Sequence, residues 1–176
     1  MKSIYLMLII CFCGTFISAQ INNDLKEQER IDKYVEKIGN DTSIKRYEFK
    51  ILNNKKLTTY HFWKKNNDVV YIERSWDYPV GNYNYTESES FNIQNGKRVM
   101  AFESLQYEMK NDSEDVGGWS CRFWIKKDEV INMISLGNGK TEDENWDYEK
   151  ELADNFKEMI NEIKKAEKNK SAKPIK

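Results

Sequence analysis

The chain has 176 residues, of which 39% are hydrophobic, with 28 basic and 29 acidic side chains. Lys2 is the only charged residue before residue 20, so the formal net charge changes from −1 to −2 if that segment is removed. A slightly acidic chain of one-domain size argues against a nucleic-acid-binding protein and predicts no strong attraction to an anionic membrane.

The first 19 residues read as a secretory signal peptide. Lys2 gives a positive start, Ile4–Ile17 is uncharged and mostly apolar, and small residues follow up to Ala19. This order is typical of a cleavable signal. We expect cleavage near Ala19–Gln20 and a secreted or periplasmic protein of a bacterial cell envelope, with no membrane span left after cleavage.

Two other interpretations of this segment stay open. A membrane anchor needs about 20 apolar residues, and this run is shorter. Lipid attachment at Cys11 or Cys13 is disfavoured because the bulky Ile10 and Phe12 precede those cysteines, where lipoprotein signals usually place a small residue.

An amphipathic helix is expected directly after the leader. Leu25, Ile31, Tyr34, Val35 and Ile38 share one helical face, and a glycine follows them. Their spacing of three and four residues predicts a helix that ends near Ile38.

The middle of the chain alternates between apolar and polar residues with a period of two, which predicts strands. We expect about seven strands, over residues 47–51, 57–64, 69–76, 83–93, 97–109, 119–125 and 130–136. Asn95-Gly96 is a strong hairpin signal. The alternation in residues 97–109 slips, which predicts a bulge near Glu103–Ser104. Residues 77–82 and 111–118 are expected to be loops.

A second amphipathic helix is expected over residues 146–166. Leu152, Phe156, Met159, Ile160 and Ile163 recur at helical spacing after an acidic, capping-rich segment. The Lys-rich tail, residues 167–176, is expected to be disordered. The domain therefore spans residues 20–166.

These elements predict an α+β fold. Short turns force neighbouring strands to run antiparallel. We expect a single curved, half-barrel-like meander of about seven strands, flanked by an N-terminal and a long C-terminal helix that cover one sheet face.

The usual catalytic and metal-binding groups are scarce. His61 is the only histidine, and Cys121 is the only cysteine after the leader. His61 lies among strand aromatics, and Cys121 alternates with apolar residues, which favours a buried position. The acidic runs at 112–115 and 142–144 lack EF-hand spacing and read as solvated loops. We therefore expect no catalytic residue, no metal and no cofactor.

Aromatic residues near polar segments are the best binding candidates, because aromatics with a polar group are enriched at binding surfaces. By strand phase, Trp119 is expected to point inward and Trp124 outward, with Ser120 and Arg122. The candidate binding residues are Trp124, Tyr78, Tyr83, Tyr85, Trp63 and His61.

Three functions remain. The first is a non-enzymatic protein that binds a small molecule or an envelope protein on the curved sheet. The second is a hydrolase that uses carboxylates such as Glu73, Glu87 and Glu89. The third is a structural or assembly subunit that joins a complex through an exposed strand edge. The aromatic excess without catalytic groups favours the first.

Overall fold

A computed structural model describes residues 22–110 and 112–175, with the backbone alone over 112–115. The expected signal peptide and its cleavage position lie outside the described residues. Within the described part of the chain, no helix has both the length and the apolar character needed to cross a bilayer.

The described elements are two helices, eight strands and one short 3₁₀ helix. The N-terminal helix covers residues 22–39. It is followed by β1 (Lys45–Asn53), β2 (Lys56–Lys65), β3 (Asp68–Val80), β4 (Tyr83–Gln94), β5 (Lys97–Met109), β6 (Asp112–Lys126), β7 (Glu129–Leu136), η1 (Lys140–Glu142), α2 (Tyr148–Lys168) and β8 (Lys173–Ile175).

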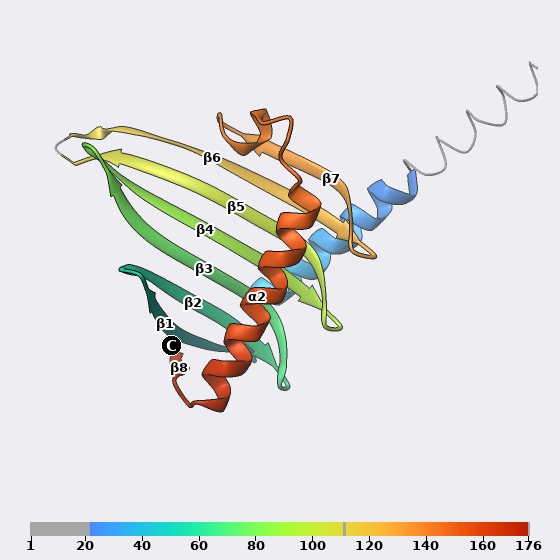
Figure 1. The fold of residues 1–176 in the computed structure, drawn as a ribbon. Coiled ribbons are helices and arrows are strands. Elements are labelled where there is room, and N and C mark those ends of the chain that lie inside the picture. The colour runs from blue at the N-terminus through green and yellow to red at the C-terminus, as the bar shows by residue number, and fades with distance from the viewer. Residues whose placement is uncertain (1–21, 111, 176) are drawn as a thin grey trace, which may run out of the picture.

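All strands form one twisted and curved antiparallel sheet, with the order β7-β6-β5-β4-β3-β2-β1-β8 (Figure 1). The predicted α+β meander between two helices is confirmed, with one more strand than expected. That strand lies in the tail that the sequence predicted to be disordered. Arg46 pairs with Ile175 and Glu48 with Lys173, so β8 occupies backbone groups of β1 that would otherwise form a free edge.

Tight turns hold the meander together. Asn95 and Gly96 have φ values of 54° and 74°, the left-handed pair that a type I′ hairpin turn requires. Asn66 and Asn67 repeat this conformation with φ values of 55° and 90°. Asparagine tolerates this region better than most residues, which explains why the turns are rich in it.

The α2 helix packs on one face of the sheet. Asp147 caps its first turn by accepting a hydrogen bond from the backbone N–H of Lys150. Leu152, Met159 and Ile163 are buried against apolar residues of β1–β6. Those residues are Phe49, Tyr60, Phe62, Ile72, Phe91, Ile93, Ala101, Trp119, Cys121, Phe123 and Ile125.

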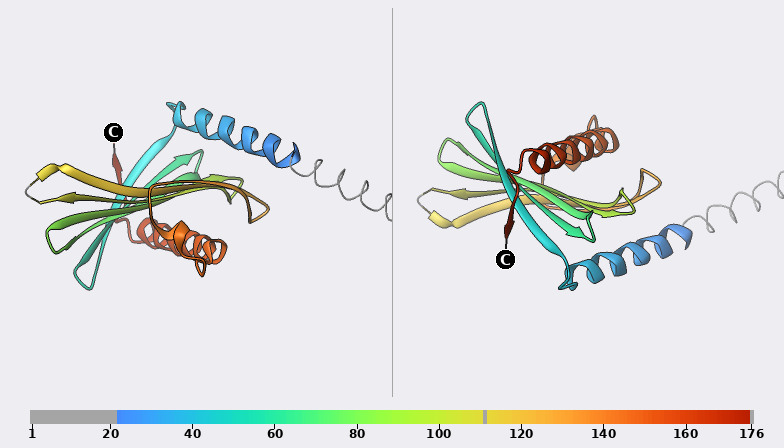
Figure 2. Two further views of the ribbon diagram at one scale, coloured as in Figure 1. Left: turned by 90° about the horizontal axis from the view of Figure 1, so that it is seen from above. Right: turned by 90° about the horizontal axis from the view of Figure 1, so that it is seen from below.

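The N-terminal helix packs on the other face, which corrects the expectation that both helices cover one face (Figure 2). Its Ile31 is buried in a separate cluster with Val99, Met100 and Trp124. The middle of the sheet is therefore buried on both sides. A strand buried on both sides loses the clean alternation on which face assignment from sequence depends.

The break in the apolar–polar alternation of β5 also has a different origin from the one predicted. The bulge lies at Val99, because Asn92 pairs with Met100 while Ile93 pairs with Arg98. Glu103 and Ser104 are regularly paired on both sides. The alternation slips because Met100 and Ala101 are both buried, under different helices.

Two segments expected to be loops are strands instead. β3 continues to Val80, and β6 begins at Asp112. These extensions lengthen β3–β6 at one end, where they pair with each other over residues that carry many tyrosines.

Candidate functional site

Strands β3–β6 run past both helices at one end. There the end of β3 meets the start of β4, the end of β5 meets the start of β6, and neither helix lies over the sheet (Figure 1 and Figure 2). We call this region the open end. The face of the open end that is continuous with the α2 side carries three of the six sequence-predicted binding residues, Tyr78, Tyr83 and Tyr85.

Four tyrosines form a contiguous cluster on that face. Tyr78 of β3, Tyr85 of β4 and Tyr107 of β5 are direct cross-strand partners. The rings of Tyr78 and Tyr85 stack with their centroids 5.5 Å apart, and Tyr107 lies 5.7 Å from Tyr85. Tyr83 meets Tyr107 edge-on at 5.7 Å. All four are half-buried, so this tyrosine cluster offers ring surface to solvent.

A glycine on the next strand makes room for the cluster. Gly117 of β6 pairs with Tyr107, and a methyl group at Gly117 would lie 2.3 Å from the Tyr107 hydroxyl oxygen. The phenol ring therefore lies across the bare backbone of β6. Glycines within strands often mark places where another group approaches the backbone closely, as the Tyr107 ring does here.

A polar contact joins the tyrosine cluster to the rest of the face. The Tyr78 hydroxyl donates a hydrogen bond of 2.6 Å to Glu87. Desolvation and then the Glu87 carboxylate raise the pKa of Tyr78 to about 12, so its phenol stays neutral. Next to Tyr78 on this face, the ammonium group of Lys56 lies 3.5 Å from the centroid of the buried Trp76 ring.

Three carboxylates gather deeper on the same face, between the sheet and α2. Glu89 of β4 and Glu103 of β5 are cross-strand partners, and Glu151 reaches them from α2. One carboxylate oxygen from each lies within 4.8 Å of the other two. Lys140 bridges two of them, at 3.0 Å from Glu103 and 2.6 Å from Glu151. Arg74 contacts Glu89 at 2.7 Å.

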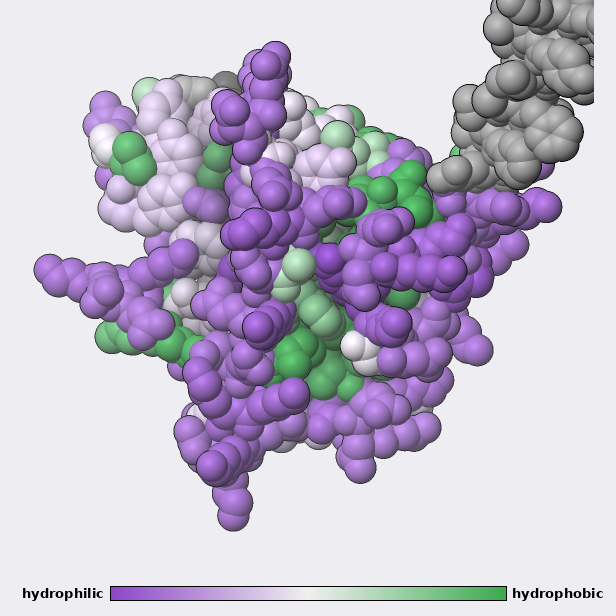
Figure 3. All heavy atoms as spheres, turned by 45° about the vertical axis from the view of Figure 1, so that its right-hand side comes forward, coloured by the Kyte–Doolittle hydropathy of each residue, from purple (hydrophilic) through white to green (hydrophobic). Residues whose placement is uncertain are grey.

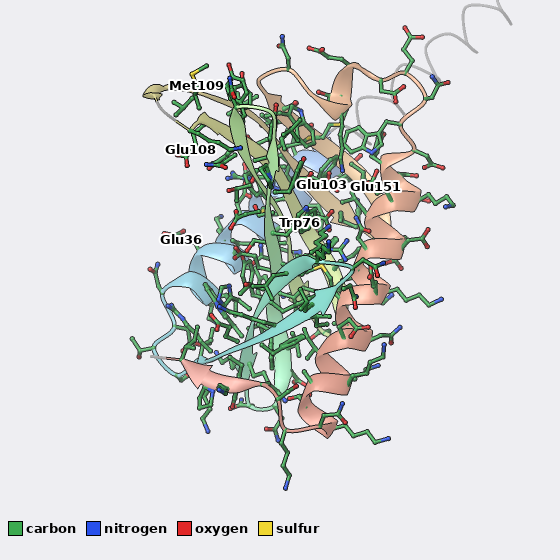
Figure 4. All side chains as sticks on the ribbon, turned by 60° about the vertical axis from the view of Figure 1, so that its left-hand side comes forward. Glu36, Trp76, Glu103, Glu108, Met109 and Glu151 are labelled. Atoms are coloured by element: carbon green, nitrogen blue, oxygen red, sulfur yellow. The ribbon has the colours of Figure 1, made fainter. Side chains whose placement is uncertain are left out.

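Glu103 is the most constrained member of this carboxylate cluster. It is 2% exposed, and its Oε1 atom has no hydrogen-bond partner. Burial raises the pKa of Glu103 to about 7, against the opposing effect of Lys140. Figure 4 shows Glu103 and Glu151 next to each other between the sheet and the helix. A cavity of about 100 Å³ lies beside Glu103, lined also by Glu87, Glu89 and Trp119.

His61 and Trp63 lie away from the tyrosine cluster. Their strand phase places them on the opposite face of the sheet from Tyr60 and Phe62, which pack under α2. His61 Nε2 lies 3.1 Å from a Glu48 carboxylate oxygen. Trp63 packs on Tyr71 at 4.5 Å. The structure thus separates two of the six predicted binding residues from Tyr78, Tyr83 and Tyr85.

Trp124 does not point outward to solvent as predicted. It is 2% exposed beneath the N-terminal helix, and its indole N–H donates a 2.7 Å hydrogen bond to Asp32. Its phase was correct, because it lies on the face opposite Trp119 and Cys121. The prediction was wrong because it assumed that this face is exposed to solvent, whereas the N-terminal helix covers it.

The three acids of the hydrolase hypothesis do not converge. Glu87 and Glu89 share the α2 side, whereas Glu73 lies on the other face and accepts a 2.7 Å hydrogen bond from Tyr71. The carboxylate cluster instead contains Glu103 and Glu151, which the sequence did not suggest. Tyr107 was also missed, although it shares a strand phase with Leu105 and Met109, which was the available signal.

Two of the larger hollows on the described surface lie beside the helices. One of about 720 Å³ separates the N-terminal helix from the sheet, with Asp32, Glu36 and Arg122 on its walls. The other, of about 590 Å³, runs beside α2 between Phe156 and Val69. Figure 3 shows an apolar patch amid largely hydrophilic surface on this side of the molecule. Among the described residues, neither hollow holds three acidic, histidine or cysteine side chains close enough to share an ion.

Comparison of the chain with family models, with curated proteins and with solved structures finds no match in any of the three.

Proposed function

We propose that this protein is a non-enzymatic binding protein of the bacterial cell envelope, and that the tyrosine cluster at the open end is its ligand-binding surface. The observation that carries this proposal is the packing of four half-buried tyrosines from three strands on a face that neither helix covers. Aromatic side chains with a polar group are typical of binding surfaces.

The chemistry of this surface favours a neutral, hydroxyl-bearing ring ligand, such as a saccharide. Ring faces pack against the C–H faces of sugars, and neutral phenols both donate and accept hydrogen bonds. The Glu87 carboxylate beside Tyr78 adds an acceptor for ligand hydroxyl groups. An anionic ligand would meet that carboxylate, and the deeper carboxylates Glu89 and Glu103 lie on the same face.

Hydrolysis is less well supported than binding. Glu89 and Glu103 are buried, and the cavity beside them has a volume of about 100 Å³. Such a space holds a few water molecules and no sugar ring. A carboxyl group that acts on a glycosidic bond must reach the bond, which these two do not.

Titration of a panel of neutral oligosaccharides against the chain from Gln20 onward, followed by calorimetry, tests this proposal. We expect Tyr85→Ala to weaken binding about tenfold or more, because it removes the central ring of the cluster. Trp63→Ala is the matched control, since Trp63 is a half-buried aromatic on the opposite face. Its affinity is expected to stay within about twofold of the unmodified protein.

Absence of binding across the panel, or equal losses in both variants, would refute the saccharide site. A protein partner captured through the β7 edge instead would favour the assembly alternative. Met133, Ile134 and Leu136 are 42%, 51% and 68% exposed on that edge strand. Export is tested separately, by mass spectrometry of the cell-envelope fraction, where a mature N-terminus at Gln20 is expected.

A further inference from the structure

The carboxylate cluster of Glu89, Glu103 and Glu151 is separate from the tyrosine cluster and needs its own explanation. Its members come from β4, β5 and α2, so the tertiary fold packs three acidic side chains together between the sheet and the helix. Desolvated like charges are unfavourable unless cations or hydrogen bonds compensate them. The described contacts compensate them only in part.

Glu103 shows where compensation is missing. Its Oε2 atom accepts a 3.0 Å contact from Lys140, whereas its Oε1 atom is buried without a hydrogen-bond partner. Because Glu103 is only 2% exposed, bulk water does not satisfy that oxygen. An unpartnered carboxylate oxygen beside a small polar cavity indicates a missing positive or hydrogen-bonding group.

We propose that Glu89, Glu103 and Glu151 form a binding site for a hard divalent cation of the calcium type, which displaces the ammonium group of Lys140. Oxygen atoms that all lie within 4.8 Å of one another can converge on one ion, and calcium accepts carboxylate oxygens in flexible geometry at about 2.3–2.6 Å. Magnesium demands near-ideal octahedral geometry at about 2.0–2.1 Å and usually binds through one or two carboxylates, so a group of three carboxylates favours calcium.

Charge balance supports the exchange. Arg74 and Lys140 bring two positive charges to the three carboxylates, and Arg74 also pairs with a fourth, Glu158, at 2.7 Å, so the acidic groups outnumber the cations. A divalent ion in the place of Lys140 would bring one more positive charge to these carboxylates. The cavity of about 100 Å³ beside the cluster has room for water molecules to complete the coordination of the ion.

Lys140 is well placed to leave. Its side chain is 37% exposed, and it lies in the short η1 turn rather than in a long helix or strand. Rotation of a four-carbon side chain into solvent requires no movement of the sheet. The Lys140 ammonium group therefore competes with the cation for the carboxylates, so replacing Lys140 with a neutral residue should strengthen cation binding.

The test is calorimetric titration of calcium chloride into the chelator-treated protein, with terbium(III) luminescence as a second readout. Trp146 donates a hydrogen bond to Glu151, so an ion held there lies close enough to an indole for sensitised emission. We expect saturable binding that Glu103→Gln and Glu151→Gln each weaken more than tenfold. Lys140→Met should tighten binding about tenfold, because the competing charge is gone.

Glu142→Gln is the matched control, since Glu142 is an exposed acid two residues from Lys140. It should bind calcium as the unmodified protein does. Glu151 is more exposed than Glu103, so its variant keeps the test valid if Glu103→Gln fails to fold. No saturable binding in either the unmodified protein or Lys140→Met overturns the proposal. Binding that is unchanged by both glutamine variants overturns it as well.

Discussion

The same strands behave differently at their two ends. In β4, Phe91 and Ile93 are buried under α2, whereas Tyr83 and Tyr85 at the open end are half-buried and pack against other tyrosines. In β5, Met100 and Ala101 are buried on opposite faces, whereas Gln106 and Glu108 farther along are exposed.

This contrast shows what each end requires. The covered end needs apolar volume on both faces, because two helices exclude water from it. The open end needs side chains that are stable while partly wet, and tyrosine meets that need with an apolar ring and a polar tip. The proposed binding surface and the core thus lie on the same strands, and they differ in whether helices cover them.

The largest expected effect is a loss of stability at the covered end. Phe62 is fully buried and stacks on Tyr47 with ring centroids 5.0 Å apart. Phe62→Ala should lower the free energy of unfolding by about 3–5 kcal/mol through the cavity that it leaves. Tyr85→Ala at the open end should cost roughly 1 kcal/mol. Urea denaturation of both variants measures the contrast, and equal losses would contradict it.

The next largest effect is the dependence of the free energy of unfolding on pH, through the buried carboxyl group of Glu103. Burial raises the pKa of Glu103 from 4.5 to about 7, so the folded state binds this proton more tightly than the unfolded state. The stability it contributes is full below pH 4.5 and is lost as the pH rises through 7. The loss integrates to about 3 kcal/mol.

Glu103→Gln isolates that contribution. In the presence of a chelator, the free energy of unfolding of the variant relative to the unmodified protein should rise between pH 4.5 and 8. Glu151 contributes in the opposite direction: against desolvation, the hydrogen bonds from Lys140 and Trp146 lower the pKa of its carboxyl group. A difference that stays flat with pH would show that Glu103 is ionised throughout.

A smaller loss of stability is expected from weakening the contact between the N-terminal helix and the sheet. Trp124→Phe removes the 2.7 Å hydrogen bond to Asp32 and part of the buried ring volume. We expect a loss of about 1–2 kcal/mol in the free energy of unfolding. Hydrogen exchange should accelerate in residues 22–39 and stay unchanged in α2. Faster exchange in both helices would mean that the two layers are not independent.

The smallest effect on stability is expected at the open end, with the largest consequence for binding. Gly117→Ala places a methyl group against the Tyr107 ring and forces that ring out of the cluster. We expect a cost of roughly 1 kcal/mol in stability. Saccharide affinity should nevertheless fall as in Tyr85→Ala. Gly81 is unsuitable as a control because its φ of 57° disfavours alanine, whereas Gly39 has no atom within 4 Å and suits one.

Local features of the fold were readable from the sequence. Alternation located the first seven strands, and the Asn-Gly pair at residues 95–96 marked a hairpin turn that the structure confirms. Helical spacing predicted α2 over 146–166, close to its bounds at Tyr148–Lys168. These features are set by backbone conformation and by which residues lie within one turn or one pleat of each other.

The candidate sites were only partly readable. Tyr78, Tyr83 and Tyr85 were predicted and do come together, because they flank one turn. Tyr107 joins them only because of the bulge at Val99. Without that extra residue, the turn at Asn95-Gly96 would set Gln106 opposite Tyr85, and Glu89 would not face Glu103. The bulge was expected in β5 but at the wrong position.

The sequence by itself determined the order of the elements, the antiparallel meander and the amphipathic faces of the two helices, because these follow from local periodicity and short connections. Only the tertiary structure decided which face of the sheet each helix covers, and so whether Trp124 is wet or buried. It also decided that Glu89, Glu103 and Glu151 meet. Such contacts depend on strand register and layer packing between segments far apart in the chain, which no local pattern records.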